Sequence, residues 1–108
     1  MRMLAAALSA LATAASVSQA QAGDPQAGRA LVGQCRTCHG LDGIATIPIA
    51  PHLAGESEIY LQTQLKAYRS GEREHEMMTV VAKNLSDQEI ADLAAWYESI
   101  KITATMPE

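Results

Sequence analysis

The chain has 108 residues, of which 12 are acidic and 8 are basic, so its net charge is −4 with neutral histidines. This acidic balance argues against binding to nucleic acid, because phosphate contacts need a basic surface. With no Phe, three Tyr and one Trp, the chain has few large side chains for a core, and a domain of this size is marginally stable without a further contribution.

The first 22 residues have the composition of an export signal. Met1 and Arg2 form a short basic start, residues 3–17 are rich in Ala and Leu, and residues 20–22 have the small-residue pattern of a cleavage site. We therefore expect a secretory signal peptide over 1–22, a single domain over 23–108 and a periplasmic location. The apolar stretch is shorter than the roughly 20 residues of a membrane span, so no span is expected after cleavage. An uncleaved anchor helix is the alternative.

A first helix is predicted to begin at Pro25. Asp24 can accept hydrogen bonds from the free amides of the first turn, and Pro is well tolerated at the first helical position. Ala27, Ala30 and Leu31 continue the helical pattern. The helix is expected to run as far as Gln34, directly before the cysteines.

Residues 35–39 have the sequence CRTCH, which is the pattern of a covalent haem attachment site. Cys35 and Cys38 each offer a thiol to one haem vinyl group, and His39 offers its imidazole to the iron. A redox dithiol and a metal site are the alternatives. A dithiol motif belongs near a βαβ pattern, which is absent here. Zinc needs four ligands, and His52 and His75 are too scattered to complete such a set.

Residues 40–55 are rich in Gly and Pro and are predicted to form a loop. An iron-ligating histidine needs a hydrogen-bond acceptor for its second ring nitrogen. The carbonyl of Pro51, in this loop, is a candidate acceptor for Nδ1–H of His39. Stiffening of the loop is a second role for Pro51 that is compatible with the first.

A second long helix is predicted over 57–69, because Leu61, Leu65 and Tyr68 repeat with helical spacing. Gly71 is expected to end this helix. A charged segment follows over 72–76, and residues 79–83 are expected to form a short helical turn.

Met77 and Met78 are the candidates for the second axial ligand of the iron. A thioether ligand closes the site and raises the reduction potential, whereas an open position suits a gas sensor or a catalyst. Both methionines could instead fill the core. His52 and His75 are rival ligands, although a histidine in a loop or beside several glutamates is more typically solvated.

The last helix is the best-marked element. Residues 86–89 form a capping box with Ser86 as the N-cap and Glu89 three residues later. Ile90, Leu93 and Tyr97 then lie on one helical face. Because no strand pattern is present, the chain is predicted to be all-α, with long loops wrapped around a cofactor.

A wider pattern extends over six stretches of the chain, at 27–31, 35–40, 48–55, 60–65, 71–73 and 85–97. Together they resemble class I c-type cytochromes, especially small bacterial periplasmic monohaem proteins. They are also similar to domains of two-haem periplasmic cytochromes and to the haem subunit of flavocytochrome c sulfide dehydrogenase. The resemblance implies a cytochrome c-like fold of about four helices around one covalent haem c, with crossing N- and C-terminal helices.

The resemblance also implies roles for single residues. Met78 stands seven residues before the leucine of the Leu-Ser-Asp block and corresponds to the iron ligand, with Met77 as runner-up. Pro51 corresponds to the residue whose carbonyl accepts the hydrogen bond of the ligating His39. His52 departs from the pattern, because a more usual residue after this proline is apolar.

Further roles follow from the same resemblance. Arg73 corresponds to a residue that meets a haem propionate, with Arg69 and Tyr60 as further candidates. Gly28 is expected at the crossing of the terminal helices, against an aromatic residue, either Trp96 or Tyr97. The Trp at position 96 is itself a departure, since an aliphatic residue or tyrosine is common there.

The implied function is one-electron transfer by a carrier that is not itself an enzyme. Its partners are a redox protein donor and acceptor. The alternative is a tightly bound haem subunit of a dehydrogenase, with a flavoprotein that oxidises sulfide as the candidate partner. A sensor or peroxidase is disfavoured, because no obvious distal acid–base histidine is present. A single CRTCH sequence excludes a two-haem protein.

Overall fold

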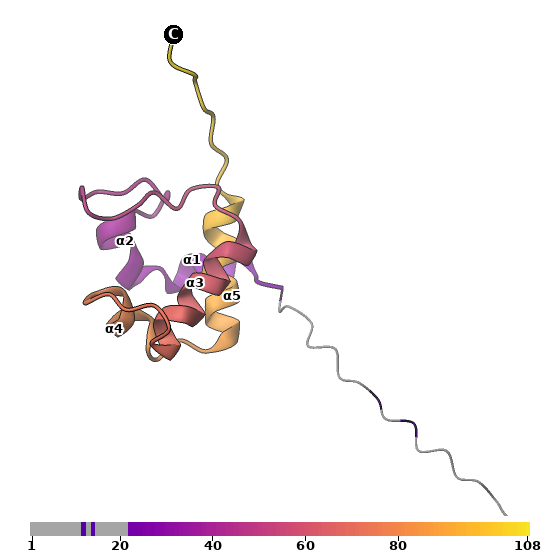
Figure 1. The fold of residues 1–108 in the computed structure, drawn as a ribbon. Coiled ribbons are helices and arrows are strands. Elements are labelled where there is room, and N and C mark those ends of the chain that lie inside the picture. Colours follow the sequence, from indigo (N-terminus) through magenta and orange to yellow (C-terminus); the bar gives the residue numbers. More distant parts are fainter. Residues whose placement is uncertain (1–11, 13, 15–21) are drawn as a thin grey trace, which may run out of the picture.

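The computed structural model describes residues 12, 14 and 22–108. The signal peptide expected over 1–22 therefore lies almost wholly outside the described residues and stays a prediction. Within 22–108 there is no strand, which confirms the all-α prediction. The helices in this part of the chain, shown in Figure 1, are α1 (Pro25–Leu31), α2 (Gly33–His39), α3 (Glu58–Ser70), α4 (Met78–Ala82) and α5 (Asp87–Ser99).

The N-terminal helical segment begins as expected but is interrupted. Asp24 caps α1 by accepting a 2.9 Å hydrogen bond from the amide of Gln26. The prediction of one helix as far as Gln34 is wrong, because Val32 separates α1 from α2. Val32 is only 3% exposed, and its carbonyl accepts from the amides of both Cys35 and Arg36. Burial of this side chain in the core thus fixes a turn of the backbone just before the cysteines.

Helices α1 and α5 cross at Gly28, where the two backbones are in close contact. A Cβ atom at this position would overlap the carbonyl of Asp92 and would lie 3.0 Å from Cβ of Trp96. Asp92, which is 7% exposed, also accepts a 2.9 Å hydrogen bond from the amide of Asp24. The expected crossing is therefore present, and Trp96 rather than Tyr97 is the aromatic residue at the glycine.

This crossing predicts a large effect for Gly28→Ala. Alanine favours helix by up to about 1 kcal/mol over glycine, but overpacking against a rigid backbone costs typically 1–3 kcal/mol and occasionally more. We expect the free energy of unfolding, measured by denaturant titration of the haem-loaded protein, to fall by about 2 kcal/mol.

Gly33→Ala is the matched control for that experiment. No atom lies within 4 Å of the position that a Cβ at Gly33 would occupy. The free energy of unfolding should therefore stay unchanged or rise by up to about 1 kcal/mol. A Gly28→Ala protein as stable as the Gly33→Ala protein would show that the helix crossing is not tightly packed.

The core lies between α5 and the helices that pack against it. α1 and α3 both contact α5, and α4 packs on α3 (Figure 1). Ser86 and Glu89 form the predicted capping box at the start of α5. The main cluster of buried apolar residues comprises Val32, Leu61, Leu93, Ala94 and Tyr97.

Helix α3 begins and ends one residue later than the predicted range of 57–69. Ser57 caps its first turn, and Gly71 ends it with a positive φ of 83°, a conformation that glycine adopts without strain. Near its C-terminus, Arg69 donates to the carbonyl of Leu85 at 2.9 Å and to the carboxylate of Asp87 at 2.6 Å. The hydrogen bond and charge of this guanidinium lower the pKa of Asp87. Arg69 therefore links α3 to the start of α5.

The remaining described segments are loops and a tail. The long loop of residues 40–57 passes above α2 in Figure 1, and α4 lies below α2 on the same side of the molecule. Helix α4 begins at Met78, one residue before the expected start. Residues 101–108 are exposed and extend away from the helices. Of the helices that the structure describes, none has the length and apolar composition needed to cross a bilayer.

Candidate functional site

His39 is the last residue of α2 and is buried, with 7% of its surface exposed. Its Nδ1 lies 2.9 Å from the carbonyl oxygen of Pro51, the pairing expected from the sequence. Because a carbonyl can only accept, Nδ1 carries the proton in this contact. Nε2 is then the ring nitrogen that remains able to bind a metal.

Cys35 and Cys38 lie three residues apart in the same helix, so their side chains share one face of α2. Both thiols are free and partly buried, and Cys35 packs against the core cluster. Burial raises the pKa of the Cys35 thiol to about 11. A redox dithiol requires a thiolate of lowered pKa, so this environment does not favour the dithiol alternative.

A metal site built from protein side chains alone also lacks support. No group of three or more His, Cys, Asp and Glu side chains able to hold a metal ion occurs among residues 12, 14 and 22–108. Zinc would need four such ligands. Of the chemistries considered for the CRTCH sequence, covalent attachment of a cofactor is the one that this environment suits.

The loop after α2 folds back over His39 and is closed by its own hydrogen bonds. The amide of Thr46 donates to the carbonyl of Cys38 at 2.9 Å, which ties the loop to the end of α2. The amide of Leu53 donates to the carbonyl of Gly43 at 2.8 Å, and the amide of Ala45 donates to Nδ1 of His52 at 2.8 Å. These contacts hold the returning segment of the loop, which carries Pro51.

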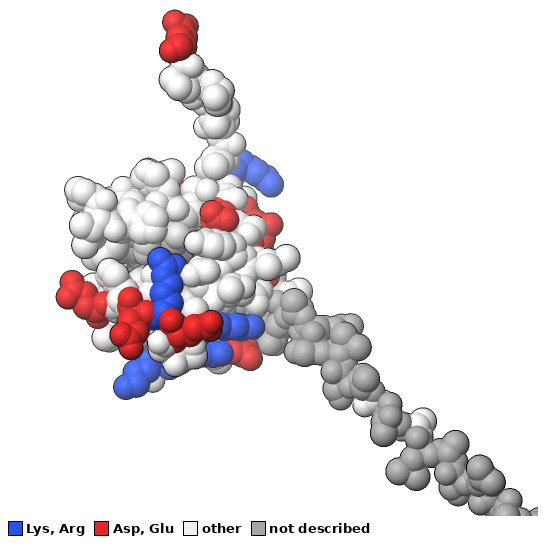
Figure 2. Space-filling model, viewed as in Figure 1, with Lys and Arg blue, Asp and Glu red and all other residues white. Residues whose placement is uncertain are grey.

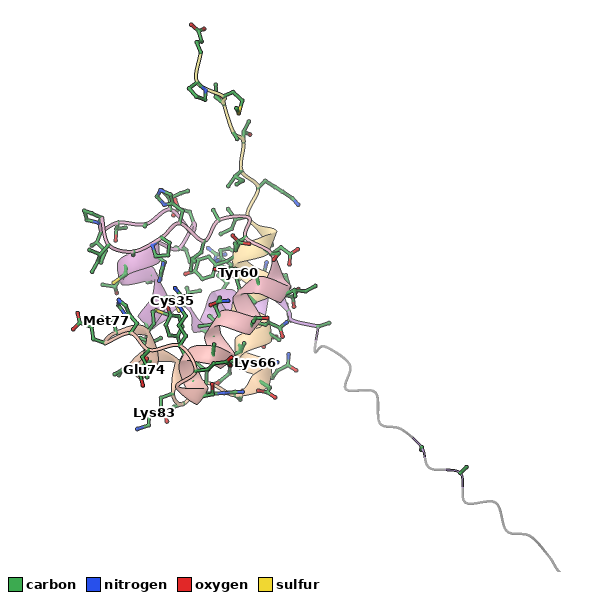
Figure 3. The ribbon with its side chains drawn as sticks, viewed as in Figure 1. Cys35, Tyr60, Lys66, Glu74, Met77 and Lys83 are labelled. Atoms are coloured by element: carbon green, nitrogen blue, oxygen red, sulfur yellow. The ribbon has the colours of Figure 1, made fainter. Side chains whose placement is uncertain are left out.

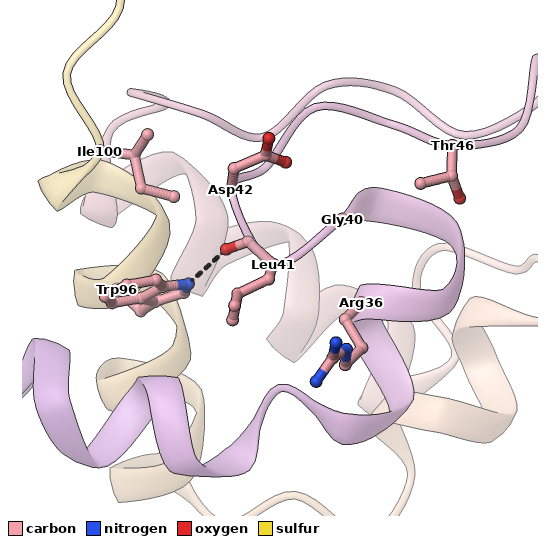
Figure 4. A pocket seen from close by; sticks show the side chains of 7 residues that line it. All are labelled: Arg36, Gly40, Leu41, Asp42, Thr46, Trp96 and Ile100. Carbon is pink, nitrogen blue, oxygen red and sulfur yellow. Dashed lines mark hydrogen bonds between the residues drawn. The ribbon is translucent and has the colours of Figure 1, made fainter.

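Helix α5 fixes the backbone that directly follows His39. Trp96 donates from Nε1 to the carbonyl of Leu41 at 2.9 Å, as Figure 4 shows. The hydroxyl of Tyr97 donates to the carbonyl of Gly40 at 3.1 Å in a buried contact. Burial is the main cause that raises the pKa of Tyr97, so this hydroxyl keeps its proton.

These two contacts were not predicted from the sequence. The available signal was the adjacent pair Trp96 and Tyr97 on a helix with a buried face, because buried Trp and Tyr usually find an acceptor for their polar hydrogen. The acceptors, Gly40 and Leu41, are more than 50 residues away in the chain. Local patterns give no indication of such a pairing.

Tyr97→Phe should destabilise the protein measurably. Removing the hydroxyl leaves the carbonyl of Gly40 with the 3.4 Å bond from the amide of Gly43, and the loss of one such hydrogen bond costs about 0.5–1.5 kcal/mol. We expect denaturant titration to show a loss of unfolding free energy in this range, with the helical content unchanged. A loss of less than about 0.5 kcal/mol would mean that water replaces the hydroxyl at no cost.

Met77 and Met78 stand at the start of α4. Met77 is 55% exposed, whereas Met78 is the first residue of the helix and is half-buried. Nδ1 of His75 accepts hydrogen bonds from the amides of Met77 at 3.1 Å and Met78 at 3.3 Å, and Thr79 accepts from the amide of His75. In Figure 3, Met77 and Cys35 lie on the same side of the molecule. The side chain of His75 is an acceptor for two backbone amides at the start of α4.

The guanidinium of Arg73 contacts two side chains of α3. It donates to Oε1 of Gln64 at 2.7 Å and lies over the ring of Tyr68 at 4.7 Å. Tyr60, another residue considered for a propionate contact, is 49% exposed on α3. The contact of Arg73 with a haem propionate stays a prediction.

Comparison with known proteins decides the family. The Cytochrome c family model matches residues 25–101. The chain belongs to the cytochrome c family. It is 48% identical over 81 residues to cytochrome c-554(548) from Halomonas halodenitrificans, an alignment that covers 72% of this cytochrome and 98% of that protein.

Two larger proteins are also similar to this cytochrome. The crystal structure of reduced cytochrome c4 from Pseudomonas stutzeri matches with a TM-score of 0.70 and 39% identity, over 74% of this chain and 47% of that one. A thiosulfate dehydrogenase electron acceptor from Stutzerimonas stutzeri is 33% identical over 64% of this chain and 33% of that protein. This cytochrome therefore spans less than half of these two proteins.

The residues present fit a covalently bound haem. Two free thiols lie one helical turn apart on α2, and the adjacent imidazole is buried with its Nδ1 already engaged. The family match and this donor set together establish one covalent haem c, attached through Cys35 and Cys38. The cytochrome is an electron carrier rather than an enzyme, as its relatives are, and its partners are other redox proteins.

Proposed function

We propose that this cytochrome is a periplasmic one-electron carrier whose haem iron is bound by His39 and Met78. The observation that carries the proposal is the 2.9 Å contact between Nδ1 of the buried His39 and the carbonyl of Pro51. Such a contact fixes the ring orientation and raises the donor strength of a ligating histidine. A buried imidazole N–H needs an acceptor in any role, so the contact points to ligation because His39 also follows the two cysteines of the CRTCH sequence.

Each residue of the site has a task in this function. Cys35 and Cys38 hold the cofactor covalently, and the contact of Pro51 with Nδ1 of His39 leaves Nε2 free to bind the iron. Met78 is the better thioether candidate, because it is half-buried at the fixed start of α4 and Met77 is 55% exposed. When bound, the haem supplies a one-electron Fe(III)/Fe(II) couple. Fixed ligands limit the rearrangement that accompanies each transfer.

The surface next to Cys38 supports docking of a partner. No charged residue occurs between Gly43 and Gly55, and Figure 2 shows an uncharged surface over this loop, with most charged side chains gathered below it. Ile44 is 47% exposed and Ile49 is 79% exposed. Transient electron-transfer complexes bury less than about 1,200 Å² in total. We propose that this loop provides such an interface for the donor and the acceptor.

The proposed location rests on residues 1–22. Their basic start, apolar stretch and small-residue end are typical of a secretory signal, and the relatives are bacterial c-type cytochromes. Intact mass of the exported protein should correspond to residues 23–108 plus one haem. A mass that includes residues 1–22 would instead support an uncleaved anchor.

A second candidate is a dedicated haem subunit of one oxidoreductase. The similarity to a thiosulfate dehydrogenase electron acceptor favours it, because that relative is named as the electron acceptor of a dehydrogenase. A flavoprotein that oxidises sulfide is the partner implied by the resemblance to flavocytochrome c. Size-exclusion chromatography of material from native cells separates the candidates: a free carrier elutes alone, whereas a subunit elutes with its enzyme.

Exposure of the reduced protein to carbon monoxide tests the closed iron site. With His39 and Met78 both bound, no position is open, so the absorption spectrum at neutral pH should not change. A shift of the haem bands on addition of the gas would show an exchangeable axial position. That result would mean that the protein is a sensor or catalyst rather than a carrier. The proposed thioether attachment of the haem would be unaffected.

A further inference from the structure

His52 is an exposed residue whose imidazole is nevertheless engaged in the loop. Its Nδ1 accepts a 2.8 Å hydrogen bond from the backbone amide of Ala45, seven residues earlier. Because an amide can only donate, Nδ1 carries no proton and the ring N–H is on Nε2. The side chain therefore bridges the outgoing and returning segments of the loop.

The bridge lies directly beside the residue that contacts His39. His52 follows Pro51, whose carbonyl is 2.9 Å from Nδ1 of His39. Pro51 has no backbone N–H, so it cannot anchor its own position by donating a hydrogen bond. The next backbone closure toward the C-terminus is the bond from the amide of Leu53 to the carbonyl of Gly43. Pro51 is therefore flanked by two loop contacts: the amide of Ala50 donates to the carbonyl of Ile47 at 3.3 Å, and the side chain of His52 reaches across the loop to Ala45.

We propose that His52 is a positioning residue for the iron ligand. By accepting the amide of Ala45, it holds the carbonyl of Pro51 against Nδ1 of His39 and so helps to set the donor strength of that imidazole. The proposal rests on the proposed ligation of the iron by His39. An apolar residue at position 52 has no acceptor for the amide of Ala45 and cannot make this bridge.

The expected direction follows from the chemistry of the ligand. A hydrogen bond from Nδ1 of a ligating histidine makes the ring a stronger donor, and a stronger donor favours the more positively charged ferric state. If the carbonyl of Pro51 is held less firmly, its hydrogen bond with Nδ1 of His39 is weaker. The ferrous state then gains relative stability, and the reduction potential rises.

The test compares His52→Leu, which removes the acceptor, with His52→Asn, whose side-chain oxygen can replace Nδ1. Three quantities are measured on the haem-loaded protein: hydrogen exchange of the Ala45 amide, exchange of the His39 Nδ1 proton, and the midpoint potential. In His52→Leu we expect both protons to exchange about tenfold faster. We expect the ferrous-to-ferric ratio at fixed potential to rise about threefold, or about 28 mV at 59 mV per tenfold change.

His52→Asn should restore all three quantities to within about twofold of the original protein. Ile59→Ala is the control, because it removes a large side chain that is 77% exposed on α3, outside the loop, without removing a hydrogen bond. That variant should leave the exchange of both protons and the potential unchanged.

Three results would overturn the proposal. Unchanged exchange at Ala45 in His52→Leu would mean that the bridge is absent in solution. Faster exchange at Ala45 with an unchanged His39 proton and potential would reduce His52 to a loop contact without influence on the iron. A His52→Asn protein that behaves like His52→Leu would exclude the acceptor as the cause. Failure of the proposed function would be recognised separately, on the unsubstituted protein. That protein would then bind carbon monoxide, or no His39 proton coupled to the haem would be detected.

Discussion

Replacing both Cys35 and Cys38 by alanine should give an exported chain that has no attached haem and no stable fold. These are the only two cysteines, so no thioether bond to the cofactor can form without them. The polypeptide core is small: Ile90 is the one large side chain that is fully buried among the residues that the structure describes. A domain of this size is marginally stable by itself, and the covalent haem is expected to supply the missing apolar contacts.

The measurements for this pair of substitutions are intact mass and thermal unfolding followed by circular dichroism. Arg36→Ala with Thr37→Ala is the matched control, because both residues are exposed and lie between the cysteines in α2. The control protein should carry one haem and unfold cooperatively. A cysteine-free chain that also unfolds cooperatively, without haem, would show that the polypeptide folds on its own.

Met78→Ala should lower the reduction potential by at least about 100 mV, within the roughly 0.8 V range over which axial ligands set haem potentials. Loss of the thioether removes a ligand that favours the ferrous state and opens the site to water. The weak long-wavelength absorption of ferric iron bound by a thioether should disappear at the same time. Potentiometric titration followed by visible absorption measures both effects on one sample.

Met77→Ala is the control that the sequence itself provides. Met77 is the adjacent residue, has the same side chain and is 55% exposed, whereas Met78 is half-buried. We expect the Met77→Ala protein to keep both the potential and the long-wavelength absorption. If Met77→Ala loses them and Met78→Ala keeps them, the ligand is Met77 and our assignment is wrong.

Short-range chemistry made much of this protein predictable from its sequence. The caps at Asp24 and Ser86 and the glycine that ends α3 act within a few residues, so the starts of α1 and α5 and the end of α3 could be read directly. The CRTCH sequence places two thiols and an imidazole within one helix, and it needs no tertiary information to indicate haem attachment. The contact of Gly28 with the last helix was expected from the position of a glycine inside a helix and, in part, from the family resemblance.

The arrangement around His39 was decided by tertiary structure. No local pattern indicated that burial of Val32 would divide the first helix in two. The bonds from Trp96 and Tyr97 to the backbone after His39 join residues 55 and 57 positions apart. The pairing of a side-chain donor with a distant carbonyl depends on how the helices pack, and no local pattern encodes it.

The two histidines outside the haem motif show the same division. The sequence determined that His52 and His75 stand in a loop and beside glutamates, which suggested solvated side chains or rival ligands. Only the folded chain brings Nδ1 of His52 to the amide of Ala45, and Nδ1 of His75 to the amides that begin α4. Residue type sets which atoms can accept a hydrogen bond, whereas the path of the backbone decides which donor reaches them.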